Sequence, residues 1–195
     1  ASDDILSALV NAEVDGDKLT DQDLGSIFML FAVAGNDTTR NSTSHGIRLF
    51  AENPEQWDRL RAEPDLLPSA MEEVVRVASP IIHFRRTTTV DTELAGVQIP
   101  AGEPVVMFYE SANQDDDVFE DAQRFDIGRS PNQHSGFGGG GPHFCLGANL
   151  ARTELRATFS RLAEKVSGFE VGQADHLTSS FANGIKRMPV TIHPA

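Results

Sequence analysis

Apolar positions repeat at helical spacing through the first part of the chain. A long helix is predicted over residues 20–52, because Thr20 and the acidic residues after it are typical of a helix start and an apolar-rich run follows. The first half of this helix is the more apolar, so we expect that half to be buried. A second helix is predicted over residues 66–78 and ends near Pro80.

The pattern changes after this second helix. Residues 82–110 have the threonine-rich composition of strands, with turn signals such as Ala95-Gly96. A loop-rich acidic stretch follows, and then a glycine-rich loop over residues 136–147. A helix is predicted over residues 147–166, with short strands after it. This order predicts a mainly α fold with small β-sheets.

Length and composition exclude several classes of function. The chain has 195 residues, enough for one domain with a sizeable core. Its net charge of −13 disfavours nucleic acid as a partner, and we expect none. The longest apolar run, residues 27–34, is too short for a membrane span, which needs about 20 residues. A single cysteine excludes an internal disulfide framework, and with no signal peptide visible we expect a cytoplasmic location.

The single cysteine, Cys145, follows four glycines and stands just before the predicted helix over residues 147–166. A thiolate is stabilised by backbone N–H groups and by the positive end of a helix dipole. Glycines allow the backbone to approach a ligand closely and to turn its amides inward. These features suit an axial thiolate ligand to haem iron.

Other interpretations of this segment are weaker or remain open. A lone cysteine is often a small buried hydrophobic residue. Residues 136–141 match the dinucleotide-binding pattern G-x-G-x-x-G, but loop-type residues rather than an apolar strand precede them. A phosphate-binding loop would need Gly-Lys-Ser or Gly-Lys-Thr after the glycines, which is absent. Zinc is disfavoured because His143 and Cys145 lack a second ligand pair at metal-site spacing.

The long helix contains a second unusual segment, Ala34 to Thr39, with a glycine, an asparagine, Asp37 and Thr38 between them. Such residues have low helix propensity, and a threonine hydroxyl can bond to a carbonyl one turn back, so we expect the helix to open locally here. An acid beside a hydroxyl could pass protons to a bound ligand. The alternative is a solvated Asp–Thr pair near a kink.

The third feature is a charged pair on the helix over residues 66–78. Glu73 and Arg76 are three residues apart and therefore share one helix face. Taken alone, this is a common salt bridge worth a few tenths of a kcal/mol.

Arg85 and Arg86 open the strand region, and arginines near a haem could pair with its propionates. An ordinary surface cation is the better interpretation for Arg85.

Three features, in their order along the chain, resemble the cytochrome P450 family of haem-thiolate monooxygenases. They are the segment from Ala34 to Thr39, the Glu73–Arg76 pair and the glycine loop ending at Cys145. The resemblance implies that the chain has the C-terminal half of the cytochrome P450 fold and binds haem b. Segments such as residues 84–87 and 183–187 are most similar to soluble bacterial members, actinobacterial enzymes that hydroxylate sterol side chains or methyl-branched lipids.

The resemblance also implies roles for individual residues. Asp37 and Thr38 correspond to the acid–alcohol pair that delivers protons to iron-bound dioxygen. Cys145 corresponds to the axial ligand of the haem iron. The other implied haem-binding residues are Ala34, Arg86, Phe137, His143 and Gly147. The implied buried charge network contains Glu73, Arg76 and Arg124. The apolar residues expected to line a substrate pocket are Val33, Ile81, Ile82, Phe84 and Phe181.

The sequence departs from the family pattern in two ways. Phe137 stands eight residues before Cys145, one more than is common, because the glycine run is one residue longer. The N-terminal half of the family's fold is missing, so we expect a fragment, a split chain or an incompletely sequenced gene. Electrons would come from a separate ferredoxin or flavoprotein, since flavin, NAD and iron–sulfur motifs are absent from this sequence.

Three classes of function follow from these observations. The first is the catalytic half of a monooxygenase that inserts one oxygen atom from O2 into an apolar steroid or branched-lipid molecule. The second is a haem-binding module without turnover, which would not need Asp37 and Thr38. The third is a folded fragment without haem.

Overall fold

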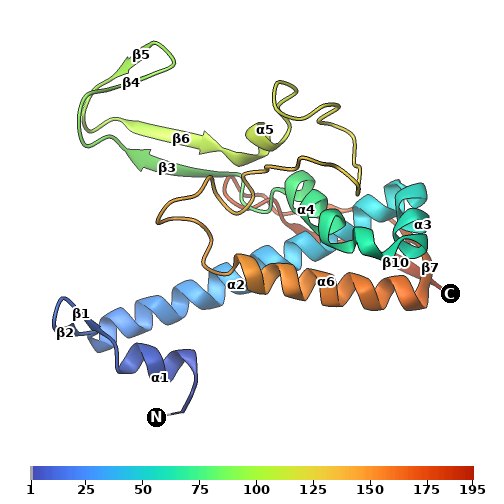
Figure 1. The fold of residues 1–195 in the computed structure, drawn as a ribbon, viewed down its shortest axis with the longest axis horizontal. Helices are drawn as coiled ribbons and strands as arrows, with labels where there is room; N and C mark the ends of the chain where they lie inside the picture. Colours follow the sequence, from blue (N-terminus) through green and yellow to red (C-terminus); the bar gives the residue numbers. More distant parts are fainter. Residues whose placement is uncertain (1) are drawn as a thin grey trace. The chain divides into compact units, whose positions relative to one another are not determined.

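The computed structural model describes residues 2–195, which form helices and short antiparallel strand pairs (Figure 1). Contacts within the chain divide it into two compact units, residues 1–37 and residues 38–195. The helices are α1 (Ile5–Val10), α2 (Asp21–Glu52), α3 (Pro54–Ala62), α4 (Leu67–Ala78), α5 (Tyr109–Asn113) and α6 (Ala148–Lys165), with a 3-10 turn at Pro64–Leu66.

The strands form five two-stranded antiparallel sheets in the described part of the chain. They pair as β1 (Glu13–Val14) with β2 (Asp17–Lys18), β3 (His83–Thr87) with β6 (Pro104–Phe108), β4 (Thr92–Leu94) with β5 (Val97–Ile99), β7 (Val166–Val171) with β10 (Val190–Pro194), and β8 (Asp175–His176) with β9 (Ile185–Arg187). This mixture of helices with small sheets confirms the predicted fold class.

The first unit holds α1, the β1–β2 pair and the first half of α2. None of its described residues is buried, and Phe28, Leu30 and Val33 are exposed by more than half. The prediction that the first half of the long helix is buried is therefore wrong for this structure. The physical reason is that one short helix and two short strands offer too little apolar surface to cover it.

The helix α2 is also continuous from Asp21 to Glu52. The expected local opening around residues 34–39 is therefore absent. The hydroxyls of Ser42 and Thr43 donate to the carbonyls of Thr38 and Thr39, each at 2.9 Å, while the helical pattern is kept. Side-chain bonds to the preceding turn are thus accommodated without breaking the helix.

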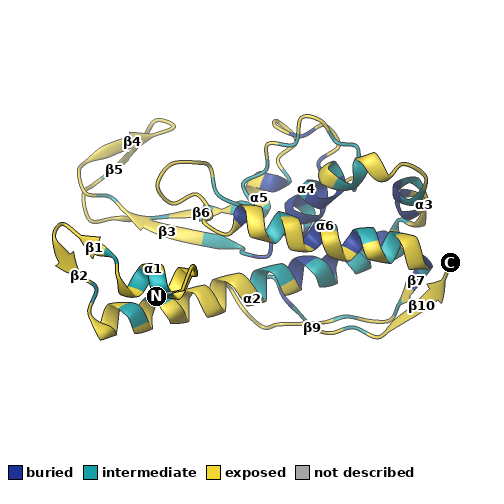
Figure 2. Cartoon of the chain, turned by 60° about the horizontal axis from the view of Figure 1, so that its bottom comes forward, coloured by how far each residue is buried: buried dark blue, intermediate teal, exposed yellow. Residues whose placement is uncertain are grey.

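The second unit has a single apolar core between α2, α3, α4, α6 and β7. Figure 2 shows the buried residues gathered on α3 and α4 and on one side of α6. Phe50 is central, with its ring 4.9 Å from Trp57, 5.4 Å from Phe125 and 5.6 Å from Phe159 between ring centroids. Aromatic pairs at these distances stabilise a core beyond the area they bury.

The absence of a side chain at Gly46 lets α2 approach its neighbours closely. A Cβ atom at this position would lie 2.5 Å from Phe159 Cζ on α6 and 3.2 Å from Val74 Cγ1 on α4. The core therefore fixes the mutual positions of α2 after residue 38, α4 and α6. Among residues 2–195, no helix combines the length and apolarity that crossing a bilayer requires.

Candidate functional site

The loop before α6 presents the cysteine thiol to the surface. Gly138 has a φ of +93°, a conformation that favours glycine, and the chain then turns back so that the Cys145 N–H donates to the Phe137 carbonyl at 2.9 Å. The side chain of Cys145 is exposed. The alternative that this residue is a buried hydrophobic group is therefore wrong.

The thiol stands directly before the N-terminus of α6. Gly147 occupies the cap position, and its carbonyl accepts the Ala151 N–H at 2.9 Å. A Cβ atom at Gly147 would approach the Cys145 sulfur at 4.0 Å, so glycine leaves the flank of the thiol open. The helix dipole places partial positive charge beside the sulfur.

The donor chemistry of this loop fits haem iron better than a polynuclear or zinc centre. No group of three or more His, Cys, Asp or Glu side chains within residues 2–195 could hold a metal ion. A single sulfur donor is the axial ligand type of haem-thiolate proteins. The residues on either side of the cysteine, Phe144 and Leu146, are apolar and exposed, Leu146 by 86%. Exposed apolar side chains beside the sulfur suit contact with the apolar haem ring.

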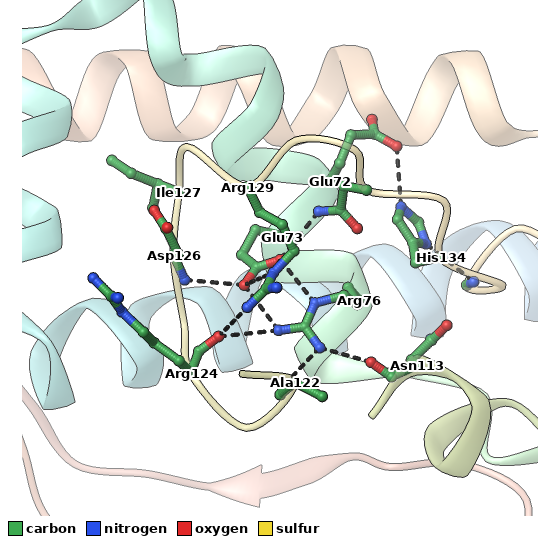
Figure 3. Close-up of polar contacts among 12 residues, drawn as sticks. Glu72, Glu73, Arg76, Asn113, Ala122, Arg124, Asp126, Ile127, Arg129 and His134 are labelled. Carbon is green, nitrogen blue, oxygen red and sulfur yellow. Dashed lines mark hydrogen bonds and ion pairs between the residues drawn. The ribbon is translucent and has the colours of Figure 1, made fainter. Parts of the chain in front are cut away.

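The helix α4 carries a fully buried charge pair, Glu73 and Arg76, which the loop after α5 surrounds (Figure 3). The Arg76 guanidinium donates to both Glu73 carboxylate oxygens, at 2.8 and 2.9 Å. It also donates to the carbonyls of Asn113 at 2.6 Å, Ala122 at 2.8 Å and Arg124 at 3.1 Å. One guanidinium therefore satisfies three backbone carbonyls, one at the end of α5 and two in the loop that follows it.

Arg124 takes part in this network through its carbonyl, which also accepts from Arg129 at 2.9 Å. The second guanidinium on the Glu73 carboxylate belongs to Arg129, whose Nε lies 3.2 Å from both carboxylate oxygens. The sequence analysis missed Arg129. Arg129 stands five residues after Arg124 in the same loop. A loop has no periodic pattern that would show which of the two arginines contacts Glu73.

A second polar cluster connects α4 with α6 and with the cysteine loop. Glu72 binds Arg152 through two contacts of 2.7 and 2.8 Å, and its Oε2 lies 3.1 Å from His134 Nε2. Burial raises the pKa of Glu72, but the hydrogen bonds from Arg152 and His134 outweigh it and bring the pKa down to about 2. The Arg152 guanidinium lies 4.3 Å from the centre of the Phe137 ring. The sequence analysis did not single out these three polar residues.

Four of the five predicted pocket residues lie together in the second unit. The Phe84 and Phe181 rings are 5.5 Å apart in an edge-to-face arrangement. The Ile82 N–H donates to the Phe181 carbonyl at 2.8 Å, and Ile81 forms a β-bridge with Ala182. Both phenylalanine rings are about two-fifths exposed. An apolar, partly exposed surface therefore forms where the start of β3 meets the turn before β9.

The remaining predicted residues are distributed as follows. Arg86 is exposed on β3 and donates to the Arg85 carbonyl at 3.0 Å. His143 is exposed in the cysteine loop. Val33, Ala34 and Asp37 belong to the first unit, whereas Thr38 begins the second.

The chain as a whole matches one protein family. An exposed cysteine in the loop directly before a helix, in a mainly α fold, has the donor type of a haem-thiolate protein. The family model for cytochrome P450 matches residues 2–171. The chain belongs to the cytochrome P450 family, and this membership implies a haem cofactor.

Individual relatives agree with this assignment. The chain is 49% identical over 191 residues to a methyl-branched lipid omega-hydroxylase of Mycobacterium tuberculosis, covering 97% of this chain and 45% of the relative. It is 47% identical to a steroid C26-monooxygenase of Mycolicibacterium smegmatis, covering 97% of this chain and 44% of the relative. The solved structure of a Mycobacterium marinum cytochrome P450 in complex with pseudoionone superposes with a TM-score of 0.94 at 51% identity, covering 97% of this chain and 46% of that one. The chain thus spans about half the length of these relatives.

Proposed function

We propose that this chain is the C-terminal, haem-binding half of a haem-thiolate monooxygenase that inserts one oxygen atom from O2 into an apolar steroid or branched-lipid molecule. The observation that carries the proposal is the exposed Cys145 thiol at the N-terminus of α6, in a loop that the family model covers. The names of the relatives, a lipid omega-hydroxylase and a steroid C26-monooxygenase, support this substrate class.

Haem b, when bound, supplies the oxygen-activating chemistry, which a thiolate ligand favours by donating electron density. The protein residues supply binding, orientation and protons. The Cys145 thiolate would hold the iron, while the exposed Arg86 and His143 side chains would donate hydrogen bonds to the propionates. Ala34, Phe137 and Gly147 would contact the ring, the two smaller residues permitting close approach.

Proton delivery is proposed for the acid–alcohol pair. Asp37 and Thr38 are consecutive residues of α2. A carboxylate can take up a proton from solvent, and a neighbouring Thr38 hydroxyl can pass it on at Oγ1. A haem-binding module without turnover would not need this pair, which favours the enzyme among the alternatives.

The substrate would be positioned by apolar contacts. Ile81, Ile82, Phe84 and Phe181 form one apolar surface in the second unit, and Val33 is an exposed apolar side chain of α2. Such a lining suits an apolar ligand with few polar groups. The rest of the pocket would come from an N-terminal half like that of the full-length relatives, and electrons from a ferredoxin or flavoprotein.

The test is the absorption spectrum of the reduced, haem-loaded chain under carbon monoxide. A strongly red-shifted Soret band is expected in the wild type, because it reports thiolate ligation. The matched variant Cys145→Ser should give the unshifted position or bind no haem. An unshifted band in the wild type would contradict the proposal, since histidine or neutral thiol would then be the ligand.

A further inference from the structure

The cluster of Glu72, His134 and Arg152 is separate from the buried pair of Glu73 with Arg76. Glu73 directs its carboxylate to Arg76 and Arg129, whereas the adjacent Glu72 reaches α6. Consecutive glutamates on α4 therefore serve two different clusters. Glu72 and Arg152 keep 22% and 24% of their side chains exposed, so this second cluster lies at the edge of the core.

The Arg152 guanidinium is held in a fixed orientation. Its Nε and Nη2 donate to the two Glu72 carboxylate oxygens, at 2.7 and 2.8 Å. Two parallel bonds between a planar guanidinium and a carboxylate fix the orientation of both groups. The hydrogen bond to Glu72 raises the pKa of Arg152. The guanidinium is therefore charged and held in one plane.

The side chain of His134 is almost fully buried beside Glu72. Its Nδ1 accepts the Gly136 N–H at 3.1 Å, so the ring hydrogen must be on Nε2. That Nε2–H then donates to Glu72 Oε2 at 3.1 Å. One imidazole thus connects the backbone at the start of the cysteine loop to the carboxylate that holds Arg152.

Arg152 is also connected to the cysteine, through Phe137. The Arg152 guanidinium carbon lies 4.3 Å from the centre of the Phe137 ring, within the range of a cation–π interaction. The Phe137 carbonyl accepts the Cys145 N–H at 2.9 Å. The contacts therefore form one continuous series from Glu72 through Arg152 and Phe137 to the backbone of Cys145.

We propose that Arg152 is a positioning residue for Cys145, acting through the Phe137 ring, and that Glu72 and His134 hold it in place. The significance of this positioning for ligation rests on the proposed function, but the positioning itself does not. If Arg152 only joined α4 to α6, its loss would weaken the whole second unit and not the cysteine loop in particular.

The test is hydrogen exchange of individual amides in the chain without haem, with Arg152→Met as the main variant. The Cys145 N–H should exchange roughly 2- to 30-fold faster than in the wild type, the range that losing a cation–π contact implies. Amides in the middle of α4 and α6 should change much less. Arg152→Lys keeps the charge but loses the planar guanidinium. Its Cys145 N–H exchange rate should therefore lie between those of the wild type and Arg152→Met.

Two further variants keep the proposal falsifiable. Glu164→Gln removes the exposed Arg161–Glu164 pair from the same helix and should leave Cys145 exchange unchanged. Phe137→Leu removes the ring and leaves the Glu72–Arg152 pair intact, so it should speed Cys145 exchange even if Arg152→Met does not fold. Uniform acceleration across the second unit, or none at Cys145 in Phe137→Leu, would overturn the proposal.

The haem-loaded chain gives an independent readout. In Arg152→Met, the reduced carbon monoxide complex should contain a larger unshifted fraction than in the wild type, because the thiolate is less well held. If the wild type itself gives no red-shifted band, the proposed function fails, whereas the exchange result still decides the positioning role.

Discussion

The carboxylate of Glu73 and the guanidinium of Arg76 meet one helical turn apart on α4, with neither side chain exposed to solvent. Their two hydrogen bonds, at 2.8 and 2.9 Å, leave further donors on Arg76 for three backbone carbonyls. The pair therefore connects α4 to a loop that has turns but neither helix nor strand. Figure 3 shows how the loop closes around it.

Removing the Glu73 charge should be strongly destabilising. Glu73→Gln leaves Arg76 and Arg129 without their carboxylate, and breaking a buried pair costs about 3–5 kcal/mol. Urea unfolding followed by the fluorescence of Trp57, the single and buried tryptophan, measures this loss. The control Glu52→Gln breaks a partly exposed pair with Arg48 and should cost less than about 1 kcal/mol. Equal losses in both variants would contradict this account.

The two loop arginines should differ in their contribution to stability. Arg129→Met removes the contacts to Glu73 and to the carbonyls of Glu120 and Asp121, so a loss of several kcal/mol is expected. Arg124→Met keeps the Arg124 carbonyl, its main contribution to the network, so a loss below about 1 kcal/mol is expected. The same urea titration compares them, and a larger loss for Arg124→Met would refute the assignment of Arg129 as the third charged member.

The buried histidine of α2 predicts a pH dependence. Burial, and then the charge of Arg48, lower the pKa of His45 from 6.5 to about 4. Between pH 6.5 and about 4, His45 is protonated in the unfolded chain but stays neutral in the folded chain. The free energy of unfolding should therefore fall as the pH drops from about 6.5 to about 4, by at most about 1.4 kcal/mol per pH unit from this group.

The variant His45→Gln removes this titration, so its unfolding free energy should decline less over that pH range. His193→Gln serves as the control, because His193 is exposed. Urea titrations at a series of pH values give both slopes. A wild-type slope that His45→Gln leaves unchanged would show that other groups cause the acid dependence.

Two glycines of the cysteine loop should respond in opposite ways to alanine. At Gly136 a Cβ atom would lie 2.6 Å from Val75 Cγ1 and 3.0 Å from His134 Nδ1, so overpacking should cost about 1–3 kcal/mol. At Gly139 nothing lies within 4 Å and φ is not positive, so Gly139→Ala should be neutral or slightly stabilising. Thermal unfolding of the two variants makes the comparison. A neutral Gly136→Ala would mean that the loop does not pack against α4 as described.

Much of the fold was predictable because it depends on local patterns. Apolar spacing and capping residues gave the long helix over residues 20–52, and α2 runs from Asp21 to Glu52. The glycine run before Cys145 indicated a ligand-binding loop, and the structure has the thiol exposed there. In each case the pattern that made the prediction possible lies within one continuous segment of the chain.

What the sequence did not predict depends on residues far apart in the chain. Glu72 and Arg152 are separated by 80 positions, and neither stands in a pattern that distinguishes it from a surface charge. The buried face of α2 was also misplaced, because the apolar pattern indicates which residues can be buried and not whether this chain supplies a surface to cover them. Asn41 and His45, polar by type, are buried instead.

The occurrence of one cysteine, exposed on the loop before α6, has a practical consequence. A maleimide fluorophore can attach to this chain at a single position, so labelling is homogeneous without mutagenesis. Because that position is also the candidate iron ligand, occupancy by haem and labelling by the dye exclude each other. The fraction of chain that resists labelling would therefore count the bound cofactor directly.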